Sequence, residues 1–292
     1  MKKFMLMTIA AALIVGCSDH DEDDCLNPQN SHPVEVKASA GVSGIQTKGP
    51  VNTGQSITAG FVASATSGDY STHLWNAAGT FTASATASAA FSLAPLQFYP
   101  TDGSTIYLKG YYPLGTLSGN TVTFSETDGS NDVMISGEAS GSKTTGGALA
   151  FTFNHLLTQL QFTFKAGDGF PASGKNVSGL LLKNQQTPAS LNLNNGTVSY
   201  NPVGTGISIT GPFPISAEGT TATVYPMVKS GATSVVMDIM ADGVAYPGVT
   251  VNLNTETGKA HNIILTFTPK GITASAIVTP WVVGGTGSSN IQ

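Results

Sequence analysis

The stretch Leu191-Asn192-Leu193-Asn194-Asn195-Gly196-Thr197-Val198-Ser199-Tyr200 decides the fold class of this chain. Two short segments, 191–193 and 198–200, alternate apolar and polar residues as half-buried strands do. Between them, Asn195-Gly196 supplies the residue types that tolerate the positive φ angles of a type I′ turn. The stretch therefore predicts a β-hairpin.

The same pattern recurs along most of the chain. Turn signals such as Ser118-Gly119-Asn120 and Asp242-Gly243 separate short runs rich in Val, Ile, Thr, Phe and Tyr. No run carries an apolar stripe of helical spacing long enough for a helix. We therefore predict an all-β, mostly antiparallel fold of the β-sandwich type. The clearest predicted strands are 106–112, 121–124, 160–164, 235–240 and 263–267.

A compositional break suggests two sandwich domains in tandem. Residues 136–147 are small and polar, as flexible connections are. They divide the body into predicted domains at 34–145 and 146–292. Each half has a size suited to one sandwich.

The N-terminal residues resemble a targeting sequence. Lys2 and Lys3 precede a short apolar run, which predicts a signal peptide over residues 1–16. Ile14-Val15-Gly16-Cys17 resembles a bacterial lipobox, in which Cys17 carries the lipid. The acidic residues that follow resemble an export signal to the cell surface, and we expect 17–33 to be a solvated tether. The alternative is an ordinary secreted protein with a chance cysteine.

Composition excludes several function classes. Charged residues make up 10% of the 292-residue chain, and all 12 basic residues are lysines. A chain without arginine is poorly suited to bind nucleic acid or to grip phosphate with two hydrogen bonds. The only other cysteine, Cys25, lies in the tether, so no disulfide is expected within the folded part.

Residues that carry chemistry are sparse. His73, His155 and His261 have no second ligand at metal spacing, and we expect them to be structural. Asp238 alternates with apolar neighbours and should face solvent. Trp75 and Trp281 suit a core or an interface better than a sugar platform. We predict no enzyme, no cofactor and no metal site.

Four places together resemble the fimbrillin family, the pilin-like surface lipoproteins of the Bacteroidetes. The first is the lipobox with its acidic residues. The second is the strand-like segment from Val34 to Ile45, followed by Gln46-Thr47-Lys48 and the run at 57–62. The third is Ile106–Pro113 with its Tyr-Tyr-Pro ending. The fourth is 151–162, close to the family's F-x-H-x-L-x-x-x-x-F stretch.

The resemblance implies a fold and an assembly mechanism. It implies two transthyretin-like sandwiches whose first strand is removed when an extracellular protease cuts the following loop, here between Lys48 and Gly49. The family's usual residue at that place is arginine, which this chain lacks. Three hypotheses follow: a lysine-tolerant protease cuts at Lys48, the subunit stays uncut as a lipid-held anchor or accessory subunit, or Lys48 is an ordinary loop residue.

The resemblance also implies that a strand from another subunit fills the opened groove. The candidate donor strand presents Ile272, Ala274, Ala276 and Val278 on one side. The alternative is that this strand only closes its own sandwich. Other fimbrial subunits, the outer membrane at the cell surface, and a host or bacterial surface ligand are the implied partners.

A surface glycan-binding lipoprotein that does not polymerise is the rival function. Such proteins share the anchor, the tether and serial β-domains. They display several exposed aromatic residues on a flat face, and aromatic residues make up 8% of this chain, many within predicted strands. The sequence therefore favours the fimbrial subunit.

Overall fold

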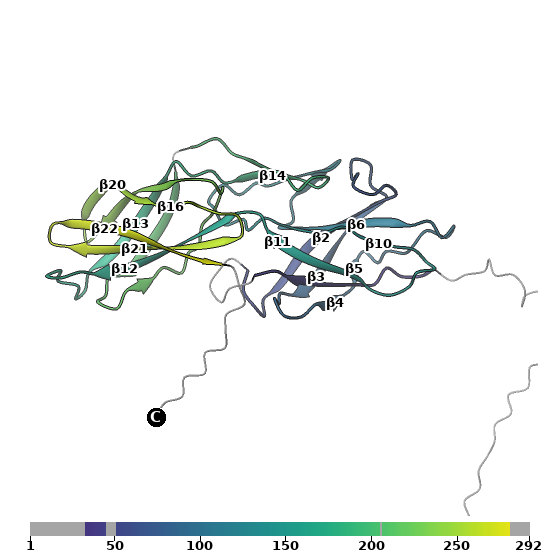
Figure 1. Cartoon of the computed structure of the whole chain (residues 1–292), viewed down its shortest axis with the longest axis horizontal. Coiled ribbons are helices and arrows are strands. Elements are labelled where there is room, and N and C mark those ends of the chain that lie inside the picture. Colours follow the sequence, from purple (N-terminus) through teal and green to yellow (C-terminus); the bar gives the residue numbers. More distant parts are fainter. Residues whose placement is uncertain (1–32, 45–50, 205, 281–292) are drawn as a thin grey trace, which may run out of the picture. The chain divides into compact units, whose positions relative to one another are not determined.

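A computed structural model describes residues 33–44, 51–204 and 206–280 of the chain (Figure 1). Across those ranges the regular elements are all β-strands, which confirms the all-β prediction. The described residues from Val34 onward belong to one compact unit. In the same ranges, no helix is long and apolar enough to cross a membrane.

The first half of the unit is built on a nine-stranded sheet. Along the sheet the strands are β4 (Ala89–Phe91), β1 (Ala38–Val42), β11 (Leu149–His155), β9 (Met134–Ser136), β6 (Ile106–Tyr112), β2 (Ser56–Ser64), β3 (Trp75–Thr82) and β5 (Leu93–Ala94), and β10 (Ala139–Gly141) pairs with β6. The sheet bends until its two ends lie against each other, since β3 contacts both β1 and β4. Phe61 of β2 then lies 4.9 Å from Phe91 and 5.0 Å from Phe151, measured between ring centroids. One folded sheet therefore encloses the first core.

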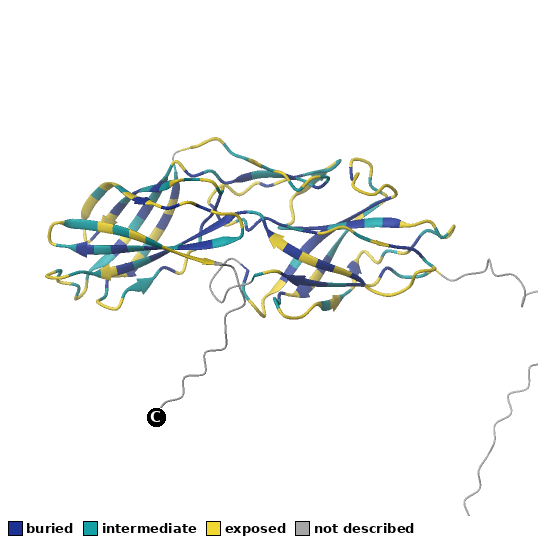
Figure 2. Cartoon of the chain, viewed as in Figure 1, coloured by how far each residue is buried: buried dark blue, intermediate teal, exposed yellow. Residues whose placement is uncertain are grey.

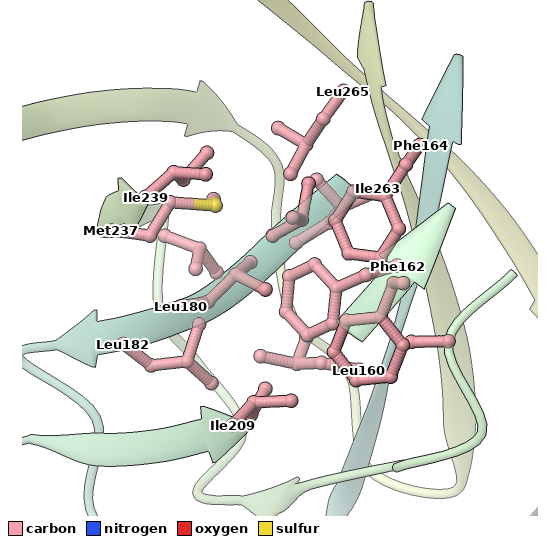
Figure 3. Close-up of a cluster of buried hydrophobic side chains, with 14 of the residues drawn as sticks. Leu160, Phe162, Phe164, Leu180, Leu182, Ile209, Met237, Ile239, Ile263 and Leu265 are labelled. Atoms are coloured by element: carbon pink, nitrogen blue, oxygen red, sulfur yellow. The ribbon is translucent and has the colours of Figure 1, made fainter. Parts of the chain in front are cut away.

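The second half is a sandwich of two separate sheets. One sheet contains β17 (Thr220–Thr221), β12 (Thr158–Ala166), β21 (Lys259–Thr268) and β22 (Gly271–Pro280), with β18 (Met227–Val228) paired to β12. The other contains β16 (Ile207–Pro214), β13 (Asn176–Lys183), β19 (Ser234–Ala241) and β20 (Val244–Asn252). The two sheets share one buried cluster, to which β12 contributes Leu160, Phe162 and Phe164 (Figure 3). This alternation is the one predicted for 160–164.

A small four-stranded sheet connects segments far apart in sequence. It contains β15 (Val198–Tyr200), β14 (Pro188–Asn192), β8 (Thr121–Thr123) and β7 (Thr116–Ser118). Val122 of β8 lies opposite Leu191 of β14, and both are fully buried in a third apolar cluster. The sheet therefore ties the strands that follow β6 to those that follow β13.

Most strand pairs are antiparallel, as predicted. The two parallel pairs of named strands are β1 with β11 and β12 with β21. Each parallel pair joins segments about a hundred residues apart in sequence. Parallel neighbours cannot be joined by a tight turn and need a longer connection.

The hairpin at 191–200 forms, but its turn is not type I′. Among the described residues, Asn184 and Asp242 are the only non-glycines with positive φ, so Asn195 does not take the required conformation. Leu193 is fully buried, like Leu191 two residues earlier, so its side chain still faces inward beyond the end of β14. The loop is therefore longer than the two residues of a type I′ hairpin. The Asn192 side chain accepts hydrogen bonds from the amides of Asn194 and Asn195 inside this loop. At Asp242-Gly243 both φ angles are positive, at 49° and 77°, and that two-residue turn is the predicted one.

The polar stretch 136–147 contains paired structure rather than a free loop. It contains β10, which pairs with β6, and it leads directly into β11 of the same sheet. Ser136 and Ser142 are buried there despite their polar side chains. Judged by sheet membership, the chain passes to the second sandwich after His155, and the division at 145–146 stays a prediction.

Candidate functional site

The first strand, β1, lies in the interior of its sheet. It runs parallel to β11 on one side, with Ala38 opposite Leu149 and Val42 opposite Phe153. On its other side it runs antiparallel to β4. A strand with neighbours on both sides cannot leave without exposing the backbone of both.

The inward side chains of this segment are small or β-branched. Val36, Ala38, Ala40 and Val42 alternate along it and are each at most 2% exposed. They belong to the same buried cluster as Phe61 and the phenylalanines of β11. Ala38 and Ala40 are buried in this cluster, so larger side chains at either position would crowd the core.

Backbone hydrogen bonds hold the segment along its whole length. They continue beyond β1 at both ends. The amides of Tyr99, Val36, Leu149, Val42 and Ser43 donate to the carbonyl oxygens of Val34, Gln97, Lys37, Ser84 and Phe153, respectively, over 2.8–3.0 Å. Removing residues 34–43 would therefore leave a groove with unpaired groups on both walls and an apolar floor.

A surface hollow lies beside the end of β1. It has a volume of about 420 Å³ and is lined by Gly41–Gly44, the loop 84–88 and Thr152. The loop passes over Gly41, whose missing side chain leaves room for it. An added Cβ there would lie 3.2 Å from the carbonyl oxygens of Ser84 and Ala87. The Ala- and Ser-rich composition of the loop does not indicate which strand it covers.

Several predicted site residues lie outside the described residues. These are the lipidation candidate Cys17, the cleavage candidates Lys48 and Gly49, and Trp281. The described chain leaves the end of β1 at Gly44 and resumes at Val51, which is 3% exposed. The predicted cleavage position therefore falls in the connection between β1 and β2.

The candidate donor strand is β22, at the edge of its sheet. It pairs with β21 over its whole length, from Gly271 opposite Thr268 to Pro280 opposite Lys259. Figure 2 shows exposed residues alternating along it. Ile272, Ala274 and Ala276 are half-buried against the second core, whereas Val278 is 45% exposed. The strand therefore closes its own sandwich in this structure, and donation to another subunit stays a prediction.

The residues considered for other chemistry make contacts within the fold. The His155 Nδ1 atom lies 2.8 Å from the Asp132 Oδ1 atom, and both side chains are buried. Asp238 lies on the outer side of β19, where the side chain of Lys183 and the amide of Gly248 hold the pKa of its carboxyl below the ordinary value. Trp75 packs against the first core. Within the part of the chain that the structure describes, no group of three His, Cys, Asp or Glu residues could hold a metal ion.

Comparison with known proteins covers most of the folded unit. A family model described as fimbrillin-like matches residues 45–281. No curated protein sequence matches the chain.

Three solved structures from Bacteroides species share this fold. A candidate cell adhesion protein from Bacteroides uniformis is 20% identical, with a TM-score of 0.62, over 86% of this chain and 98% of that one. A second, from Bacteroides ovatus, is 16% identical, with a TM-score of 0.58, over 86% and 98% of the two chains. A third, from Bacteroides fragilis, is 15% identical, with a TM-score of 0.55, over 89% and 100%. At these identities the likeness shows a shared fold.

Proposed function

The chain belongs to the fimbrillin-like family, and from this premise we propose that it is a subunit of a cell-surface fimbria assembled by strand replacement. Proteolysis removes the first strand, and a strand of another subunit takes its place. The role is structural and uses no catalytic residue. Fimbriae built in this way would serve adhesion to a host or bacterial surface.

The placement of β1 is the observation that carries this proposal. It is the first described strand, yet it lies between β11 and β4 rather than at an edge. The connection that follows it contains Lys48, and the chain before it contains only the predicted anchor and tether. One cut in that connection would separate β1 from the rest of the sheet.

The energetics favour refilling of the groove. Loss of β1 would expose the apolar floor around Phe61 and Phe151 together with the unpaired backbone of two strands. An extended peptide added to such an edge gains main-chain hydrogen bonds, and alternate side chains in pockets give specificity. An open edge is a liability for a monomer, but it is the assembly site of a polymer.

The anchor fits the same scheme. Lipid on Cys17 would hold the precursor at the outer membrane, and residues 17–33 would keep the sheet clear of its surface. The segment 17–48 would leave as one piece containing lipid, tether and first strand. A subunit that no protease cuts would keep its lipid and act as a fixed anchor.

The experiment is to block the cut in the bacterium that makes the protein. We expect Lys48→Ala to leave the surface protein at precursor length and to prevent fimbriae from forming, as seen by electron microscopy. Lys270→Ala is the matched control, because Lys270 is an exposed lysine in the turn between β21 and β22. Fimbriae of normal length and number from the Lys48→Ala chain would overturn the proposal.

A further inference from the structure

Three exposed apolar side chains lie at one end of the first half of the unit. Leu74, Leu96 and Phe98 are 52%, 53% and 45% exposed, respectively. Leu74 directly precedes β3, and the other two follow β5, which runs antiparallel to β3. All three therefore lie at the end of the sheet where β3 begins, and we call them the end patch.

The chain enters the fold at the same end. β1 runs parallel to β11, and four antiparallel pairings lead from β11 through β9, β6 and β2 to β3, so β1 and β3 run in the same direction. Direct contacts agree with this. The amide of Val36 donates to the carbonyl oxygen of Gln97 over 2.8 Å. The amide of Tyr99 donates to the carbonyl oxygen of Val34 over 2.9 Å. The end patch therefore lies beside the first described residues of the chain.

We propose that the end patch contacts the lipid surface to which the uncut precursor is anchored. This inference rests on the lipid anchor of the proposed function and adds a second membrane contact, which orients the folded unit. Pro33 follows Cys17 by sixteen residues, and a solvated chain of that length spans on the order of 20 Å. Lipid on Cys17 would keep the end patch at a high effective concentration beside the membrane.

The side chains of the end patch suit a shallow contact with lipid. Leucine and phenylalanine are residue types that enter the boundary between headgroups and acyl chains. Each of the three is about half exposed, so the contact would bury apolar surface that the free precursor leaves in water.

The charges around the end patch favour zwitterionic over anionic lipid. Among the described residues at this end, the carboxylates outnumber the lysines. They are Glu35, Asp69, Asp102 and Glu138, against Lys37 and Lys143. An anionic surface would repel this excess of negative charge. Phosphatidylcholine is therefore the lipid to test first.

The contact would direct the cleavage candidate away from the membrane. The extended chain from Val34 to Val42 starts beside the end patch and carries the backbone roughly 25 Å toward the other end of the sheet. The connection that contains Lys48 begins there, after Gly44. A cut in it would remove the anchor and also Val34 and Val36, the backbone partners of the segment 97–99. The membrane contact would therefore belong to the uncut precursor, and cleavage would release it.

Quenching of tryptophan fluorescence by brominated lipid tests the contact. We would use residues 17–292 with Cys25→Ser, coupled through Cys17 to a maleimide lipid in vesicles of brominated phosphatidylcholine. This chemical link supplies the anchor whether or not the cell acylates Cys17. Ordinary phosphatidylcholine vesicles give the unquenched emission.

Two reporter chains share a background of Trp75→Phe and Trp281→Phe. Leu96→Trp places the reporter in the end patch. Val244→Trp is the matched control, because Val244 is 52% exposed and begins β20 in the second sandwich. We expect roughly fivefold more quenching at Leu96→Trp, because only that side chain would lie at the acyl boundary. Brominated phosphatidylglycerol should quench it less than brominated phosphatidylcholine does.

A third chain avoids any substitution in the first half. With Trp281→Phe alone, the natural Trp75 next to Leu74 is the reporter, and it should also be quenched more than Val244→Trp. Equal quenching at Leu96→Trp and Val244→Trp would overturn the lipid contact. An unquenched Leu96→Trp chain that sediments as a dimer would also overturn it, and would assign the end patch to contact between copies. The vesicle test involves neither cleavage nor polymerisation, so it can fail while the fimbrial role of the subunit stands.

Discussion

Strands β1 and β22 present nearly the same inward residues and bury them to very different extents. Val42 in β1 is 1% exposed, whereas Val278 at the matching place in β22 is 45% exposed. The side chains are the same, so the difference comes from the number of neighbours: β1 has two, and β22 has one. Position in a sheet, more than residue type, therefore sets how strongly a strand is held.

The largest expected contrast comes from placing a charge at the matching positions. Val42→Asp should destabilise the protein by more than about 4 kcal/mol, because the carboxylate would lie unpaired in the first core. Val278→Asp should cost at most about 1 kcal/mol, because that side chain reaches water. Urea unfolding of the two uncut variants measures the contrast. Equal losses of stability would show that the two places do not differ in burial.

Removing the edge strand tests the same comparison at the level of assembly. A chain lacking residues 272–292 should remain a soluble, folded monomer, although Ile272 no longer covers the second core, and it should form no polymer after cleavage. A chain lacking only 281–292 keeps β22 and is the matched control, which should polymerise. Circular dichroism and electron microscopy measure the two properties. Unfolding of the shorter chain would assign β22 to its own sandwich alone.

A smaller effect should follow from shortening an exposed apolar side chain of β22. Ile277→Ala should weaken association of cut subunits by about tenfold, or about 1.4 kcal/mol, since the proposed strand replacement would bury this side chain, which is 56% exposed in the free subunit. The stability of the uncut monomer should change by less than about 0.5 kcal/mol. Thr273→Ala, also exposed on β22, is the control. Association that is unchanged in the Ile277 variant would contradict burial of this side chain.

The smallest expected effect is on the pH dependence of stability, and it originates in the second sandwich. Burial lowers the pKa of His261 in β21, and nearby Glu256 only partly opposes this. A histidine whose pKa is lower in the folded state stabilises the fold above its unfolded pKa, near 6.5, and this contribution is lost as pH falls below that value. We therefore expect the second sandwich to lose stability between about pH 7 and pH 5. His261→Gln should flatten that dependence, as measured by thermal melts; an equally steep decline in the variant would contradict this origin.

Local features of the fold were predictable from the sequence. The alternation at 160–164 and the Asp242-Gly243 turn each depend on neighbouring residues, and both form as expected. The type I′ turn predicted at Asn195-Gly196 does not form. Leu193 is buried by tertiary packing, and the loop is longer than two residues. The strand β10 within 136–147 was not predictable for a related reason, since it depends on pairing with β6 and the local composition is typical of a flexible loop.

The candidate site was predictable only in part. The segment from Val34 reads as a strand, but its parallel partner lies more than a hundred residues away in β11. No local pattern specifies such a partner, because pairing across that distance is decided by the folded core. The strand covered by the loop 84–88 could not be predicted for the same reason.

The most direct test of strand replacement is the mass of the subunit extracted from assembled fimbriae. We expect a chain that begins at Gly49, without lipid and without β1. A subunit in the fibre that still carries residues 17–48 as one continuous chain would contradict it.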